Sequence, residues 1–278
     1  MKRPRLVGMI HLPALPGTPA WDGIRFEEII DAALADAFVL QSAGFDGLLI
    51  QNSLDRPTRE RADILTVAQM ASIVTQVRLA TDILVGVNIV KNDGPSAVAI
   101  AAATGADFVR VKVLTGAVLS AEGVVSGCAA ETHALRVRSG CHTSIWGDVY
   151  EPTSRSLLAG DFDAALTDTL DFGLADAVIV TAPTEVETLE LARQVRKNRP
   201  ATHLVIGGRI TSSSVSEALA VADTVIIGSA LKRVSGIRGR VDADCAGAIV
   251  EADRAGTLSR TNRNQRVGQG EFADALDG

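Results

Sequence analysis

Short apolar runs alternate with longer segments of helical periodicity along most of the chain. Each run has four to six residues rich in Val, Ile and Leu, which is typical of parallel strands buried on both faces. The eight runs are residues 6–10, 47–50, 84–89, 108–113, 144–149, 177–180, 203–206 and 224–227.

The segments between these runs predict helices long enough to cross back over a sheet. Strict alternation of strand and helix demands a parallel sheet, and eight repeats close naturally into a barrel. We therefore expect an α/β fold, a single (β/α)8 barrel over residues 1–256, with a doubly wound open sheet as the competing topology. The predicted helices are 26–42, 61–79, 94–104, 122–139, 161–172, 185–197, 212–220 and 242–255.

The joints that lead from helix to strand share a local pattern that ends in aspartate. Asp46, Asp107 and Asp176 follow a glycine that is suited to end a helix, and Asp223 stands in a related joint. Such joints lie at the bottom of a barrel, so we interpret these aspartates as stabilising rather than catalytic. After the last predicted helix, residues 257–278 are polar and weakly periodic, which predicts a flexible tail.

Composition and charge exclude several classes of protein. The net charge of −6 comes without a basic stripe, so we expect no nucleic-acid partner. No segment is long and apolar enough to span a bilayer, and the apolar run near the N-terminus is broken by His11, Pro13 and Pro16. The three cysteines, Cys128, Cys141 and Cys245, have no metal or disulfide spacing, which favours a cytoplasmic location without a zinc site.

Residues 204–232 hold two apolar strands that both end in small residues. Gly207 and Gly208 follow the first strand, and Gly228 and Ser229 follow the second. In a (β/α)8 barrel the loops after strands seven and eight commonly bind a phosphate, because glycines allow close approach of backbone N–H groups. We interpret these four residues as a phosphate cradle, the alternative being that the glycines only turn the chain.

Further polar residues follow the other strands, whose carboxyl ends meet at one mouth of a barrel. Arg110 and Lys112 lie on one side of a strand, and two charges inside a barrel need an anion or a carboxylate. Asp148 and Glu151 could supply that carboxylate, as an acid/base set or as a structural ion pair. The residues collected at the strand ends are His11, Gln51, Asn52, Asn88, Lys91, Asn92, Asp93, Arg110, Lys112, Asp148, Glu151 and Thr181.

His11 is the candidate base for neutral pH, with hydrogen-bonded scaffolding as the alternative. The candidate catalytic set is thus His11, Arg110, Lys112, Asp148 and Glu151, and Asp93 could instead cap a helix. Magnesium could bind between carboxylates and a phosphorylated ligand, because it needs few protein ligands. The candidate substrate-binding residues are Gln51, Asn52, Asn88, Asp93, Thr181, Gly207, Gly208, Gly228 and Ser229.

Several motifs closely resemble those of the BtpA family, which includes the SgcQ proteins. They are GMIHLPALPGTP, AGFDGLLIQNSLDRP, VGVNIVKNDGPSAVAIAAATGADFVRVKVLTGA, EGVVSGCAAE and VIIGSALK, from about residue 6 to residue 242. The resemblance implies a TIM barrel of the ribulose-phosphate-binding type, and it links the founding members to photosystem I biogenesis.

Some residues depart from the pattern that relatives typically show. This chain has Gln51 where relatives carry a glutamate, Lys112 in place of an asparagine, and Tyr150-Glu151 in place of a lysine-histidine pair. Two functions follow as hypotheses: an enzyme acting on a phosphorylated sugar or nucleoside by acid/base chemistry, or a non-catalytic assembly or regulatory factor. We also expect a homo-oligomer, because barrels of this class often associate.

Overall fold

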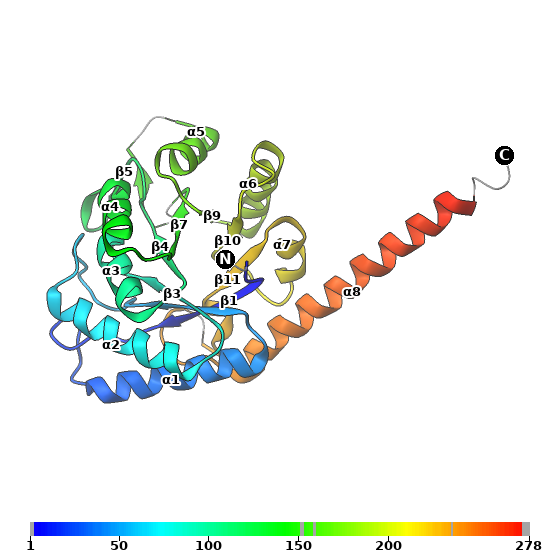
Figure 1. Ribbon diagram of the computed structural model, residues 1–278. Coiled ribbons are helices and arrows are strands. Elements are labelled where there is room, and N and C mark those ends of the chain that lie inside the picture. Colours follow the sequence, from blue (N-terminus) through cyan, green and yellow to red (C-terminus); the bar gives the residue numbers. More distant parts are fainter. Residues whose placement is uncertain (1–2, 151–152, 158–159, 235, 274–278) are drawn as a thin grey trace.

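The eight apolar runs form eight parallel strands that close into a barrel in the computed structural model (Figure 1). The structure describes residues 3–150, 153–157, 160–234 and 236–273, with side chains up to residue 259. β1 pairs with both β2 and the last strand, β11, so the barrel is confirmed and the open sheet is wrong. The strands in barrel order are β1 (Leu6–His11), β11 (Thr224–Ile227), β10 (Leu204–Ile206), β9 (Ala177–Val180), β7 (Ser144–Asp148), β4 (Phe108–Val111), β3 (Leu84–Asn88) and β2 (Gly47–Gln51).

Helices surround the barrel, and side-chain caps mark the starts of several of them. Asp63 caps α2, Asp93 caps α3 ahead of a proline, and Thr184 forms a capping box with Glu187 at α6. The helices are α1 (Phe26–Ala43), α2 (Ile64–Ala80), α3 (Gly94–Thr104), α4 (Ala129–Ser139), α5 (Phe162–Thr167) with a π-helical continuation (Asp168–Phe172), α6 (Glu185–Asn198), α7 (Val215–Val221) and α8 (Ala243–Ala273).

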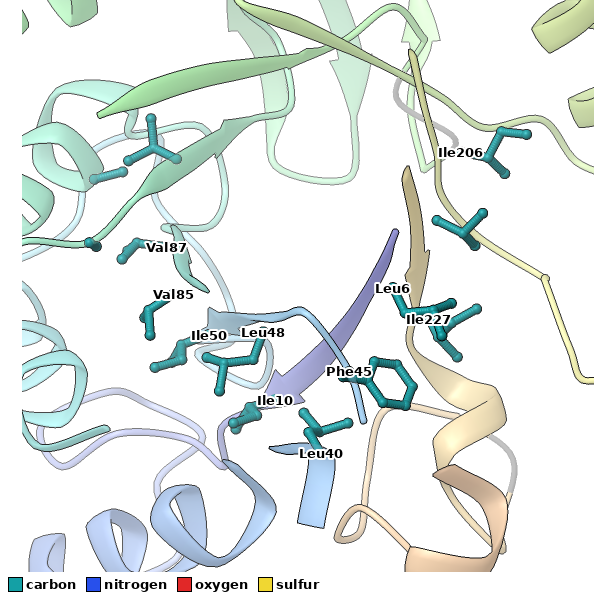
Figure 2. Packing of buried hydrophobic residues seen from close by; sticks show 14 of the residues in the cluster. Leu6, Ile10, Leu40, Phe45, Leu48, Ile50, Val85, Val87, Ile206 and Ile227 are labelled. Atoms are coloured by element: carbon teal, nitrogen blue, oxygen red, sulfur yellow. The ribbon is translucent and has the colours of Figure 1, made fainter. Parts of the chain in front are cut away.

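The core has two layers because successive strand side chains point to opposite faces. One set packs between the strands and the helices, where Leu40 and Phe45 meet strand residues such as Leu6 (Figure 2). The other set fills the barrel itself, and there the rings of Phe108 and Trp146 stack with centroids 3.9 Å apart. The barrel interior is therefore packed, and a ligand has to bind at one of its ends.

The four aspartates of the helix-to-strand joints hold the bottom of the barrel together. Each accepts a hydrogen bond from a backbone N–H at the start of a strand, which keeps that buried amide paired. The bonds run from Leu6 to Asp46 (3.0 Å), from Val85 to Asp107 (2.9 Å), from Ile145 to Asp176 (2.7 Å) and from Leu204 to Asp223 (2.9 Å). The structure thus gives these aspartates the stabilising role expected of them.

Residues 122–139 were expected to form one helix, and this prediction is wrong over its first part. β5 (Ala117–Ser120) and β6 (Gly123–Ser126) form a hairpin that pairs with β8 (Arg155–Ser156), and α4 begins only at Ala129. Gly123 has a φ of 106°, which suits a turn, and a Cβ on Gly127 would lie 2.8 Å from backbone atoms of Thr115. These two glycines favour a hairpin before the helix.

The last helix is longer than expected. The sequence predicts a helix to residue 255 and a polar tail beyond it, whereas α8 continues to Ala273 and extends away from the barrel (Figure 1). Val250 and Asp253 are still buried, whereas Leu258 is exposed, so α8 leaves the barrel surface at about this point. The flexibility of this segment stays a prediction.

Candidate functional site

The last inward position of each strand forms a ring at the carboxyl end of the barrel. Seven members lie two residues after a side chain that fills the barrel interior, as His11 follows Met9 and Arg110 follows Phe108, and Asn88 follows Gly86, whose side-chain space the Phe108 ring occupies. Strand register supports the ring, because His11 pairs with Gln51 and Gln51 pairs with Asn88. The members of this mouth ring are His11, Gln51, Asn88, Arg110, Asp148, Thr181, Gly207 and Gly228.

Arg110 and Asp148 form a bidentate ion pair on one side of the ring. Arg110 Nε donates to Asp148 Oδ1 at 2.9 Å and Nη2 donates to Oδ2 at 2.7 Å. The two side chains are 10% and 0% exposed. A carboxylate on the neighbouring strand therefore meets the buried cation, as the sequence required, and because both oxygens face one guanidinium, Asp148 is better suited to orienting Arg110 than to accepting a proton.

Four polar atoms of the ring are buried and make no hydrogen bond to any described residue. They are His11 Nδ1, Gln51 Oε1, Asn88 Oδ1 and Thr181 Oγ1, and only two other side-chain atoms of the described part, on Gln69 and Thr143, share this property. An unpaired buried polar group costs about 1–3 kcal/mol, so four of them at one end of a barrel are unusual. Such a ring is suited to ordered water and to the polar groups of a ligand.

His11 is held neutral. Burial, and then the positive charges of Lys232, Arg110 and Lys112, lower the pKa of His11 to about 3. The sequence suggested a base poised near neutral pH, but the pKa is far lower because three cations surround a buried ring. His11 therefore presents a neutral imidazole to the mouth, and an anionic ligand would oppose these cations and raise its pKa.

The four small residues of the expected cradle lie together at the ends of β10 and β11. A Cβ on Gly207 would lie 2.9 Å from Thr181 Oγ1, and a Cβ on Gly228 would lie 3.3 Å from His11 Cε1. Gly208 has a φ of 76°, and Ser229 begins a short 3-10 helix, Ser229–Leu231. Glycine at 207 and 208 thus lets the Thr181 side chain pack against the end of β10, and phosphate binding there stays a prediction.

Two expected substrate-binding residues instead hold loops. Asn52 accepts a hydrogen bond from the Val90 amide at 2.9 Å and donates to Asp55 at 2.8 Å. Asp93 accepts from the amides of Ser96 and Ala62, at 3.0 and 2.8 Å. Their polar atoms are engaged within the protein, which favours a supporting role.

The remaining strand-end residues are divided between scaffold and mouth. Asn92 bonds both the amide and the carbonyl of Val113, so it belongs to the scaffold. Lys91 donates to Thr153 at 3.1 Å and pairs with Glu122 of the hairpin at 3.5 Å. Lys112 lies near the mouth, since its charge acts on His11, and Glu151 lies outside the described residues.

Lys232 is a mouth residue that the sequence analysis did not single out. It is 6% exposed, and its Nζ donates to the carbonyls of Ile237 at 3.2 Å and Gly239 at 2.6 Å. Burial lowers its pKa. Its place directly after the last strand, in the VIIGSALK motif, was the available signal.

A cavity of about 840 Å³ opens beside the ring. Lys112, Asp148 and Thr181 line its inner end, and residues of α5, α6, β5, β8 and the loops beside them line the rest. This volume lies in the range of small-molecule sites. In the described part of the chain, no three His, Cys, Asp or Glu side chains are grouped to hold a metal ion, and no helix is both long and apolar enough to cross a membrane.

The fold and the site define a (β/α)8 barrel with a polar mouth. N-(5'-phosphoribosyl)anthranilate isomerase from Pyrococcus furiosus has a similar structure, with a TM-score of 0.55 and 11% identity over 90% of this chain and 99% of that chain. At this identity the likeness shows the fold alone. The model of the BtpA family matches residues 2–255, and the chain belongs to that family.

Relatives from two organisms cover almost the whole chain. An uncharacterized protein of Thermococcus kodakarensis is 35% identical over 255 residues, which are 90% of this chain and 95% of that protein. The Photosystem I biogenesis protein BtpA of Synechocystis is 32% identical over 268 residues, 94% of this chain and 92% of that protein. The resemblance noted in the sequence is thereby confirmed.

Proposed function

We propose that this protein is an enzyme that binds a small phosphorylated compound, a sugar or nucleoside phosphate, at the barrel mouth and acts on it by acid/base chemistry. One observation carries the proposal: four buried polar atoms of the mouth ring, three of them on adjacent strands, lack partners in the same ring as the Arg110–Asp148 pair. A protein that only needs to fold has no use for this arrangement, because each unpaired group lowers its stability.

The phosphate would lie at the ends of β10 and β11. There Gly208, Gly228 and Ser229 would offer backbone N–H groups, from which an anion accepts hydrogen bonds, whereas the Gly207 amide already donates to the Val180 carbonyl at 3.0 Å. Anchoring the phosphate would orient the rest of the molecule over the ring, which is how binding far from the reacting atoms assists chemistry. The phosphoribosyl group in the name of the structurally similar isomerase agrees with this proposal, although that name describes another protein.

The charged residues would act on the reacting part of the substrate. Arg110, held by Asp148, and Lys112 would stabilise negative charge that develops there. His11, neutral in the empty site, would donate or accept a proton once the anion of the substrate has raised its pKa. The proton-transfer role expected for Glu151 falls outside the described residues.

A binding experiment tests the anchoring step. We expect ribose 5-phosphate, but not ribose, to raise the melting temperature and to give a measurable Kd by calorimetry, with and without Mg²⁺. Lys112→Met should weaken this binding about tenfold, which is the loss of one charged contact. Lys197→Met, on the exposed end of α6, is the matched control and should bind as the unaltered protein does.

A solvent-exchange experiment tests the chemistry. Incubation in D2O with a panel of sugar phosphates should place deuterium on a carbon next to a carbonyl or hydroxyl group, as read by NMR, and His11→Gln should slow this exchange. If no phosphorylated compound binds, the proposal fails and the role of an assembly or regulatory factor, which the name of the Synechocystis relative suggests, is left. The homo-oligomer and the cytoplasmic location stay predictions, and light scattering tests the first.

A further inference from the structure

The cavity beside the mouth ring has two ends of opposite charge. Lys112 lines its inner end together with Asp148, which is paired with Arg110, and with Thr181, which lies beside the glycine end of β10. Its outer wall is formed by α5 and α6 and carries four carboxylates, with no basic side chain among the described residues that line it. The four are Asp161, Asp168, Glu187 and Glu190.

Two of the four carboxylates already have structural tasks. Asp161 caps α5 by accepting from the Ala164 amide at 2.9 Å, and Glu187 accepts from the amide and hydroxyl of Thr184 at 3.0 and 2.7 Å. The side chains of Asp168 and Glu190 have no hydrogen bond or ion pair with another described residue. These two carboxylates, one on the π-helical continuation of α5 and one on α6, line the same cavity and can therefore interact with a cation that enters it.

An independent observation shows that this cavity is built for a ligand. The hydroxyl of Thr181, a residue 7% exposed that lines the cavity, is buried and lacks a hydrogen-bond partner. The same hydroxyl lies beside Gly207, where a Cβ would approach it to 2.9 Å. Thr181 thus joins the glycine ends to the cavity, so a ligand held at the glycines continues past Thr181 towards the carboxylates.

We propose that the substrate is a phosphorylated compound that also carries a basic nitrogen, cationic at neutral pH. The phosphate lies at the glycine ends of β10 and β11, and the cationic nitrogen lies between Asp168 and Glu190. Between them the cavity wall is largely apolar, with Ala164, Ala165 and Leu191, which suits a carbon skeleton. This inference rests on the proposed function and adds the substrate class.

Two probes that differ by one group test the inference. Glucosamine 6-phosphate has an ammonium group where glucose 6-phosphate has a hydroxyl, so the ratio of their Kd values isolates the cation. We expect the unaltered protein to bind the amine about fivefold more tightly, since the carboxylates are partly exposed and such pairs are weak. In the double variant Asp168→Asn/Glu190→Gln the two Kd values should become equal, while binding of glucose 6-phosphate stays unchanged.

A double variant with the same charge change elsewhere is the control. Asp31→Asn/Glu251→Gln alters exposed carboxylates on α1 and α8, on a different part of the barrel surface from α5 and α6 (Figure 1), and should keep the fivefold preference. Equal affinity of the unaltered protein for the two probes, or a preference that survives in the cavity variant, overturns the inference alone. Failure of both sugar phosphates to bind the unaltered protein overturns the proposed function as well.

Discussion

The two ends of the barrel treat buried polar groups in opposite ways. At the bottom, Asp46, Asp107, Asp176 and Asp223 accept hydrogen bonds from strand amides, and arginines complete two of them, as Arg136 does at Asp176. At the mouth, His11, Gln51, Asn88 and Thr181 each leave an atom unpaired. Among the described residues of the bottom, the hydroxyl of Thr143 is the exception, because it is buried and also lacks a hydrogen-bond partner. The bottom is thus arranged for stability, whereas the mouth keeps unpaired polar atoms at the expense of stability.

This difference predicts opposite consequences for similar substitutions at the two ends. Removing a polar group at the bottom leaves its partner buried and unpaired, which costs free energy of unfolding. Removing an unpaired polar group at the mouth leaves nothing behind, so stability should hold or increase while binding is lost.

The largest loss of stability is expected at Arg110, because its ion pair with Asp148 is a part of the mouth in which buried polar groups are paired, as they are at the bottom. Arg110→Met leaves Asp148, which is buried, without its bidentate partner, and should lower the free energy of unfolding by about 3 kcal/mol. Urea unfolding measures it. Arg138→Met, on the exposed face of α4, is the control, and a similarly small effect for both variants would place Arg110 outside the stabilising network.

A somewhat smaller loss is expected at the bottom. Asp223→Ala leaves the buried Leu204 amide without its acceptor and removes one of the acceptors of the Arg196 guanidinium, and should cost about 2 kcal/mol in urea unfolding. Ligand binding by the folded fraction should be unaffected. Asp82→Ala changes an exposed aspartate in another helix-to-strand joint and should be neutral, so an equal loss there would remove the special role of the joint aspartates.

One substitution made at both ends gives the sharpest contrast. Thr224→Val, at the bottom, removes a hydroxyl that donates to the Pro4 carbonyl and bonds His203, so it should destabilise by about 1 kcal/mol. Thr181→Val, at the mouth, removes an unpaired hydroxyl and should stabilise by up to about 1 kcal/mol while weakening phosphate binding. Melting temperatures that fall by the same amount in both variants would contradict the comparison.

The sequence predicts which residues lie at the mouth better than it predicts what each of them does there. Alternation along the strands places Gln51, Arg110 and Thr181 correctly, because a period of two needs no tertiary information. The role of Asn52, the first residue after β2, cannot be found in this way, since its partner, the Val90 amide, comes from a different loop. The missed hairpin shows a related limit, because Gly123 and Gly127 act through local turns and contacts rather than through periodicity.

The pKa of His11 shows where sequence reasoning ends and supplies the last prediction. Burial and the charge of Lys232, which is distant in sequence, hold the folded pKa at about 3, whereas an unfolded histidine titrates near 6.5. Below pH 6.5 His11 binds a proton in the unfolded chain but stays neutral in the folded protein until the pH approaches 3. Stability from His11 is therefore complete above pH 6.5 and is lost as the pH falls towards 3.

An NMR titration measures the protonation of His11 directly. The expected effect is the smallest of these predictions, because the ring signal should not change. The ring signal of His11, assigned by its loss in His11→Gln, should stay constant between pH 8 and 5 in the empty protein. His203 at the bottom should stay constant too, because burial, first, and the charge of Arg3 lower its pKa to about 4. Saturating ribose 5-phosphate should then separate the two ends: the signal of His11 should begin to titrate because an anion has entered the mouth, while that of His203 stays unchanged. Identical behaviour of both histidines with the ligand would mean that the phosphate does not bind next to His11.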